Sequence, residues 1–230
     1  MMRRRKVLSI VTALFLAVSG AAHANSISFS DSIGLQTTNW NGNLTVSKFD
    51  PSLGTLTGIT FELTGHVQGD AKYESLDAAP ATITLNLQAS IALQRPDLSQ
   101  LVAVIPVANV SDSAAAFDST IDFGGPSGAT FTNLSGDKTE SASSPPPPSD
   151  LPLFTGIGNI ILPVVATGTS NASGAGNLIT QFATSASAGV KVTYLFDPAT
   201  TSTTPEPGSV LLLGSGLVGL WLSQRRKQSR

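Results

Sequence analysis

Apolar residues recur at every second position in the stretch Thr82-Ile83-Thr84-Leu85-Asn86-Leu87-Gln88-Ala89-Ser90-Ile91-Ala92-Leu93. Successive side chains of a β-strand point to opposite faces of a sheet, so this period of two predicts a long strand with one buried face. The same alternation recurs in residues 59–64 and 182–196. Weaker strand candidates lie at residues 27–30, 43–49, 101–110, 129–134 and 158–165.

Short turn-forming sequences separate these candidate strands. They are Asp50-Pro51, Gly69-Asp70, Arg95-Pro96-Asp97, Gly124-Gly125-Pro126 and Ser173-Gly174. No segment of comparable length between residues 25 and 197 has a helical period. Many strands joined by short polar turns are typical of an antiparallel β-sandwich, which we expect as a single all-β domain over residues 25–197.

A run of prolines interrupts the expected sandwich. Pro145 to Pro148 stand in the middle of residues 141–149, and proline cannot donate to a strand ladder. We therefore expect the whole of 141–149 to form an exposed polyproline loop. Such a loop is more often a stiff connector than a ligand for a proline-recognition domain, and the connector is the interpretation that we favour.

The N-terminal residues have the order of charges and apolar residues that is typical of a secretory signal peptide. The basic cluster Arg3-Arg4-Arg5-Lys6 precedes the apolar run 7–18, and the small residues Ala22 and Ala24 suit the two subsites of signal peptidase. Residues 1–24 are therefore expected to be a signal peptide cleaved after Ala24. The run is short for the alternative, a permanent N-terminal anchor.

The C-terminal residues contain a second export element. The step Pro205-Glu206-Pro207 follows a Thr- and Pro-rich linker, 198–204, and precedes the apolar run 210–222. The run has 13 residues, whereas a stable membrane span needs roughly 20. Basic residues then end the chain, among them Arg225, Arg226 and Lys227, and such residues stay on the cytoplasmic side. We expect a short transmembrane-like helix rather than a core helix of a soluble domain.

This order of elements over residues 205–230 resembles the PEP-CTERM sorting signal of Gram-negative bacteria, whose substrates are processed by an exosortase. The resemblance implies that Pro205, Glu206 and Pro207 are the recognition element, that the basic residues are a stop, and that the tail is removed near the Pro-Glu-Pro step. A eukaryotic glycosylphosphatidylinositol signal also uses a spacer and an apolar tail. It ends in that apolar tail, however, whereas this chain ends in basic residues.

Removal of both export elements changes the charge of the protein. The whole chain has a formal charge of −2, but residues 25–204 contain five basic and fourteen acidic residues, a formal charge of −9. An acidic exported domain is not expected to bind nucleic acid or anionic membrane surfaces. The chain has no cysteine, which excludes disulfide staples, thiol catalysis and thiolate metal sites.

Several short motifs in the body of the chain resemble an exported bacterial family named choice-of-anchor E domain. They are Phe49-Asp50-Pro51-Ser52-Leu53-Gly54-Thr55-Leu56, the strand 56–65, Thr120-Ile121-Asp122-Phe123-Gly124-Gly125 and the stretch from Leu162-Pro163-Val164 to Thr193-Tyr194. The resemblance implies a surface-anchored domain. It implies no catalytic residue.

Few residues of the body suggest chemistry. One histidine remains after signal removal, His66 in a strand-like run, and it is expected to be a surface or hydrogen-bonded residue. No nucleophilic serine motif is present, so we expect no catalytic residues and no enzyme. Paired carboxylates for glycoside hydrolysis need no motif and stay a competing hypothesis. Asp118 and Asp122, ahead of a Gly-Gly turn, are calcium candidates, with a solvated turn as the alternative and no other cofactor expected.

The sequence therefore predicts a non-enzymatic exported protein. Its expected partners are signal peptidase and exosortase, its anchoring in the inner membrane is transient, and its destination is the outer surface or the extracellular matrix. The resemblance of the tail further implies an association with exopolysaccharide or biofilm. A carbohydrate-binding, adhesin-like module and, behind it, a carbohydrate-active hydrolase are the alternatives.

Overall fold

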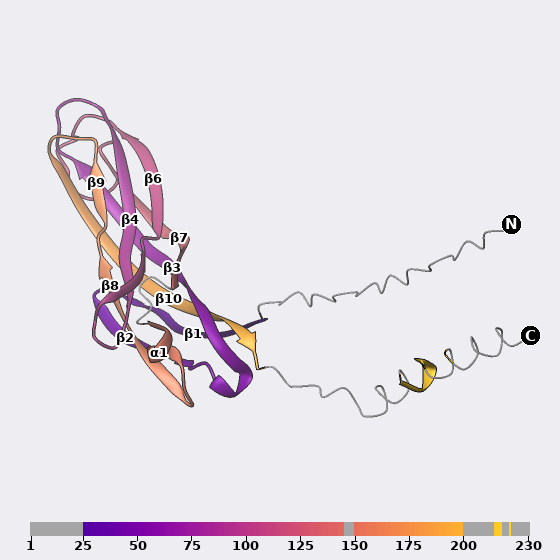
Figure 1. The fold of residues 1–230 in the computed structure, drawn as a ribbon. Helices are drawn as coiled ribbons and strands as arrows, with labels where there is room; N and C mark the ends of the chain where they lie inside the picture. Colours follow the sequence, from indigo (N-terminus) through magenta and orange to yellow (C-terminus); the bar gives the residue numbers. More distant parts are fainter. Residues whose placement is uncertain (1–24, 145–149, 200–213, 218–220, 222–230) are drawn as a thin grey trace, which may run out of the picture.

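A computed structural model describes residues 25–144, 150–199, 214–217 and 221, and residues 25–144 and 150–199 form two packed antiparallel sheets (Figure 1). Sheet A has the strand order β1 (Asn25–Thr37), β10 (Leu178–Pro198), β3 (Gly54–Ser75) and β7 (Gly128–Ser144). Sheet B has the order β2 (Trp40–Ser47), β8 (Asn159–Gly168), β4 (Ala81–Gln94) and β5 (Gln100–Val104), with β6 (Val107–Ala114) and β9 (Asn171–Ser173) also paired to β4. The antiparallel β-sandwich expected from the sequence is confirmed.

The alternating stretch 82–93 lies in β4, the central strand of sheet B. The apolar side chains at every second position face the other sheet and are 0–1% exposed: Ile83, Leu85, Leu87, Ala89, Ile91 and Leu93. The strand predicted at 101–110 is two strands, because pairing stops at Ile105 and Pro106. Proline lacks the backbone N–H that a continuous ladder needs there.

Sheet A depends on two unusually long strands. β3 and β10 pair from Gly54 opposite Pro198 to Ser75 opposite Leu178, a length of about 70 Å at the rise of an extended chain. The turn predicted at Gly69-Asp70 is wrong, since both residues lie inside β3. Gly69 is needed there for close approach, because a Cβ would collide with the carbonyl oxygen of Ala183.

Asp70 marks an irregularity in the neighbouring strand rather than a turn. The β3–β7 register shifts between Gly69 and Ala71, and Asn133 of β7 has a φ of 57°. Its N–H donates to Asp70 Oδ1 at 3.0 Å. The turn-forming residues of this region therefore build a β-bulge, which bends a strand without ending it.

The polyproline prediction was too broad. Ser141 to Ser144 belong to β7, where Ser141 lies opposite Glu62 and Ser143 opposite Thr60. These residues keep their backbone N–H groups, so the ladder continues up to the first proline. Pro145 to Pro148 lie outside the described residues. The chain is described again from the short helix α1 (Asp150–Phe154), which the sequence pattern did not predict.

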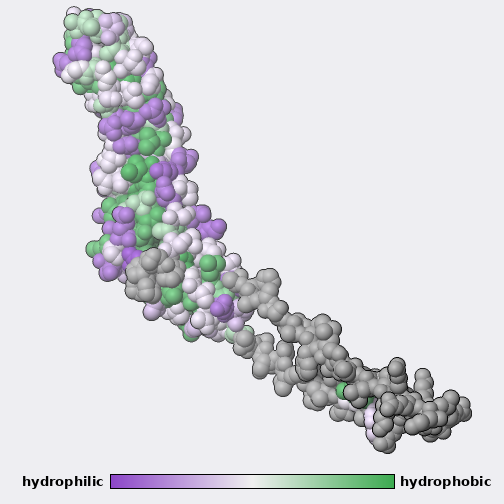
Figure 2. Space-filling view, turned by 45° about the horizontal axis from the view of Figure 1, so that its top comes forward, coloured by the Kyte–Doolittle hydropathy of each residue, from purple (hydrophilic) through white to green (hydrophobic). Residues whose placement is uncertain are grey.

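Apolar side chains fill the space between the sheets in two clusters. The larger cluster includes the aromatic residues Phe49, Phe61, Phe154 and Tyr194, whose ring centroids lie 5.1–6.4 Å apart in the contacting pairs. The smaller cluster contains Tyr73, Ile83, Leu85, Ala71 and Ala114. Two core clusters along the same long strands agree with the elongated, bent outline of the domain (Figure 2).

Both ends of the sandwich chain lie at one end of the domain. Asn25, the first described residue, pairs with Phe196, and the N–H of Ala199 donates to Leu53 O at 3.0 Å beside the 3-10 helix η1 (Pro51–Leu53). The loops 76–80, 115–127 and 174–177 lie at the opposite end, which we call the distal end. The N-terminal residues 1–24 and the C-terminal residues 200–230 are therefore attached at the end farthest from the distal loops.

The export elements themselves lie almost wholly outside the described residues. This holds for Ala22 and Ala24, for Pro205, Glu206 and Pro207, and for Arg225, Arg226 and Lys227. Residues 214–217 and 221 are helical and exposed. Among the described residues, no helix is both long enough and apolar enough to cross a membrane.

Candidate functional site

A buried carboxylate organises the distal loops. Glu74, at the end of β3, is fully buried and accepts hydrogen bonds from Ser127 Oγ at 2.6 Å and from the N–H of Phe123 at 2.8 Å. A Cβ at position 128 would collide with its Oε2, so Gly128 leaves room for the carboxylate. Backbone and hydroxyl donors thus stabilise a carboxylate that has left water.

The calcium candidates lie in this loop, where each carboxylate bonds its own turn. Asp118 Oδ1 accepts from the N–H of Thr120, and Asp122 Oδ1 from the N–H of Gly124, both at 2.9 Å. Within the described part of the chain, no three His, Cys, Asp or Glu side chains gather in a way that could hold a metal ion. The geometry thus shows how the loop is stabilised, and calcium binding by Asp118 and Asp122 stays a prediction.

His66 lies on the outer face of sheet A and bonds a neighbour across the strands. Its Nδ1 is 2.7 Å from Asp137 Oδ1, with side chains 31% and 71% exposed. This is the hydrogen-bonded strand histidine that the sequence suggested. Among the described residues, no hydrogen bond joins the His66–Asp137 pair to a nucleophilic side chain.

A shallow depression on the outer face of sheet A is lined by residues of β1, β3 and β10, among them Asp31, Glu62 and Lys191. Both oxygens of Asp31 already accept backbone N–H groups, from Ser32 at 2.8 Å and from Thr45 at 2.7 Å. Thr45 belongs to β2 of the other sheet, so Asp31 joins the two sheets along one side of the sandwich. Its carboxylate therefore has a structural role, and among the described residues the depression keeps one other carboxylate, Glu62, beside Lys191.

A second depression, on the outer face of sheet B, has a different composition. We call it the sheet B groove, a volume of about 450 Å³ lined by Asn41, Asn43, Gln94, Leu98, Pro163 and Val165 together with the backbone of Gly42 and Val164. Strand pairing places Asn41 opposite Val165 and Asn43 opposite Pro163. The groove thus combines an apolar floor on β8 with carboxamides from β2 and β4.

The carboxamides of the groove have no internal partners. In the part of the chain that the structure describes, the side chains of Asn41, Asn43 and Gln94 make no hydrogen bond. Farther along the same face, by contrast, the carboxamide Nδ2 of Asn109 donates to Asn86 Oδ1 at 2.6 Å, and that of Asn86 to Asn171 Oδ1 at 3.0 Å. The amides of the groove are therefore available to a ligand, whereas those of the Asn86 ladder are not.

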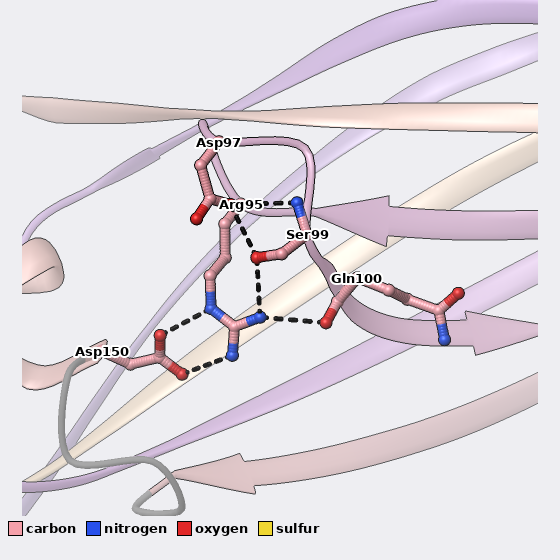
Figure 3. Close-up of polar contacts among 5 residues, drawn as sticks. All are labelled: Arg95, Asp97, Ser99, Gln100 and Asp150. Carbon is pink, nitrogen blue, oxygen red and sulfur yellow. Dashed lines mark hydrogen bonds and ion pairs between the residues drawn. The ribbon is translucent and has the colours of Figure 1, made fainter.

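The turn between β4 and β5 forms one wall of the groove and is held from below by a partly buried ion pair (Figure 3). Arg95 Nε lies 2.6 Å from Asp150 Oδ1 and Nη2 lies 2.9 Å from Asp150 Oδ2. Arg95 Nη1 also donates to Gln100 O at 2.9 Å and to Ser99 Oγ at 3.2 Å. The hydrogen bond to Asp150 raises the pKa of Arg95, so the guanidinium stays charged.

Leu98 stands at the exposed tip of this turn in a strained conformation. Its φ is 68° and it is 64% exposed, although a left-handed conformation costs a residue with a Cβ about 1–2 kcal/mol. Asp97 Oδ1 accepts from both the N–H and the hydroxyl of Ser99, at 2.9 and 2.6 Å. These bonds, which lower the pKa of Asp97, fix the turn and keep Leu98 pointing out.

The sequence analysis gave no ligand-binding role to any of the groove residues. Asn41 and Asn43 lie in β2, Gln94 ends β4, and Pro163 lies in β8, so no local motif joins them. One signal in the sequence could have shown that these residues are exposed. In a strand whose apolar residues are buried, the residues between them face solvent. That these residues lie side by side follows from the register between strands that are distant in the sequence.

Comparison with known proteins bears on the C-terminal residues. Residues 203–227 match the PEP-CTERM protein-sorting motif, which implies an exported protein that is sorted at the membrane and processed by an exosortase. The match covers a small part of the chain, so the choice-of-anchor E resemblance of the body stays a prediction. A search of curated proteins gave no match.

Similar solved structures include two of infectious bursal disease virus. The VP2 subviral particle is 14% identical with a TM-score of 0.23, and the alignment covers 83% of this chain and 42% of the viral one. The T13 viral particle is 14% identical with a TM-score of 0.19, covering 94% and 51%. This chain thus spans about half or less of their length. At such TM-scores the likeness has no bearing on function.

Proposed function

We propose that this chain is a non-enzymatic surface or extracellular-matrix domain, exported through its signal peptide and released from transient inner-membrane anchoring by exosortase processing at Pro205-Glu206-Pro207. The match of residues 203–227 to the sorting motif is the observation that carries the proposal. The body would then belong to the choice-of-anchor E type. Its destination is a Gram-negative outer surface or matrix, in association with exopolysaccharide.

The arrangement of the sandwich supports a display role. The chain leaves β10 at Pro198, next to the start of β1 at Asn25, so a tether at this end leaves the other end free. Strands of about 70 Å hold the distal loops away from the tether. The formal charge of −9 on residues 25–204 favours solubility and keeps the domain off anionic membrane surfaces.

Intact-mass measurement of the protein recovered from envelope and from medium tests this proposal. We expect a mature N-terminus at Asn25 and a C-terminus near Pro205, and a variant with Ala at positions 205, 206 and 207 should keep the tail and stay in the inner membrane. A matched variant, Ser202→Ala in the adjoining linker, should be processed normally. Recovery of most wild-type molecules with Arg230 at the terminus would defeat the proposal.

A further inference from the structure

We infer that the sheet B groove is a binding site for a neutral polysaccharide chain, an inference that rests on the proposed function and names the ligand class for it. Three observations carry it: the unpartnered carboxamides of Asn41, Asn43 and Gln94, the apolar floor of Pro163 and Val165, and the exposed, strained Leu98 on the wall. The carboxamides correspond to the hydroxyl groups of a sugar residue, and the apolar residues correspond to the C–H face of its ring.

The carboxamides match the hydroxyl groups of a sugar. A carboxamide both donates and accepts hydrogen bonds, as does a hydroxyl, so each amide can bond a sugar in either sense. Asn41 and Asn43 lie on the same face of β2, two residues apart, and Gln94 lines the groove from β4. Ligand sites usually combine an apolar floor with a few polar groups at fixed positions around it.

The apolar residues match the C–H face of a pyranose ring. Pro163 and Val165 are half-buried neighbours on β8, and Leu98 projects from the turn beside them. An apolar side chain kept exposed in a costly backbone conformation calls for a functional explanation. Contact with the ring of a sugar is such an explanation, because the ring would cover Leu98 and pack against the turn that the Arg95–Asp150 pair supports.

The charges of the region select a neutral chain. None of the described residues that line the groove is charged; on the adjoining turn, Arg95 bonds Asp150 and Asp97 bonds Ser99. The formal charge of −9 repels anionic polysaccharides. An extended peptide is a poorer occupant, since peptides add to open sheet edges, whereas β8 of the groove floor is paired on both sides, with β2 and with β4.

Affinity electrophoresis of the exported protein, purified from its host, tests the inference. Dextran, galactomannan or xyloglucan in the gel should retard the wild type, and alginate should not. N41A/N43A and Q94A should weaken retardation at least tenfold. Gln181→Ala, which removes an exposed carboxamide from β10, is the matched control and should bind as the wild type does.

Leu98→Gly separates a binding role from a structural one. Glycine removes the left-handed strain, so the melting temperature should rise while retardation falls. The inference is overturned if the wild type migrates freely in all three neutral gels, or if N41A/N43A is retarded as strongly as the wild type. Tail processing is measured separately by mass, so either of these two results would overturn the inference and leave the proposed function standing.

Discussion

Arg95 and Asp150 form a two-pronged ion pair between the β4–β5 turn and the first residue of α1. Asp150 is 3% exposed, and both of its oxygens are bound by the guanidinium, at 2.6 and 2.9 Å. A nearly buried carboxylate depends on such a partner, because without one its desolvation is uncompensated. The pair therefore joins two segments 55 residues apart and fixes the wall of the sheet B groove.

Replacement of Arg95 by Ala should lower the free energy of unfolding by about 2–4 kcal/mol, because it leaves Asp150 buried and unpaired. Arg95→Lys should recover only part of this loss, since lysine lacks the planar fork. Urea denaturation measures both. Lys138→Ala is the control: it breaks an ion pair whose side chains are 49% and 47% exposed, and should change stability by about 0.5 kcal/mol or less.

Replacement of Glu74 by Ala should destabilise the protein by about 2 kcal/mol, because the hydroxyl of Ser127 and the N–H of Phe123 lose their acceptor. Limited proteolysis should show new cleavage within residues 115–127, and urea denaturation should show the loss of stability. Glu62→Gln changes a carboxylate that faces the shallow depression on sheet A and should leave both readouts as in the wild type. Equal protease resistance in Glu74→Ala would contradict this account of the loop.

Replacement of Gly69 by Ala should cost about 2 kcal/mol or more, because the new Cβ meets the carbonyl oxygen of Ala183 in the adjoining strand. Gly189→Ala is a matched control on β10, where a Cβ would meet no atom within 4 Å. Thermal melting compares the two. Similar melting temperatures would show that β3 and β10 can separate at this position.

Neither tyrosine should titrate in the native protein at the pH of an ordinary phenol. Burial raises the pKa of Tyr194, and burial followed by the hydrogen bond to Asp112 raises the pKa of Tyr73. The neutral phenols stabilise the fold fully below the unfolded pKa, about 10, and this contribution is lost as the pH rises from there towards the folded pKa.

Tyrosinate absorbance measured against pH, together with circular dichroism, checks this expectation. The chain has only these two tyrosines, so the signal is unambiguous, and it should appear together with alkaline unfolding. A tyrosinate signal with a midpoint near pH 10 in protein that keeps its native circular dichroism would contradict it.

Prediction from the sequence succeeded where the pattern is local. The alternation at 82–93 gave both the strand and its buried face, because side-chain direction in a strand depends only on position along it. It failed at Gly69-Asp70, where turn-forming residues build a close contact and a bulge in continuous strands. It also failed at Ser141 to Ser144, where Ser-rich sequence next to prolines pairs in β7. Neighbouring strands, rather than the local residues, decided both cases.

The sequence by itself determined the class of fold, through the period of two in its strands, and the sorting motif at residues 203–227, which implies export. Only the tertiary structure decided where function can reside. Asn43, Gln94 and Pro163 come from three strands, and the Arg95–Asp150 pair spans 55 residues. Their proximity follows from strand order and register, which are set by the packing of the whole sandwich and carry no local signature in the chain.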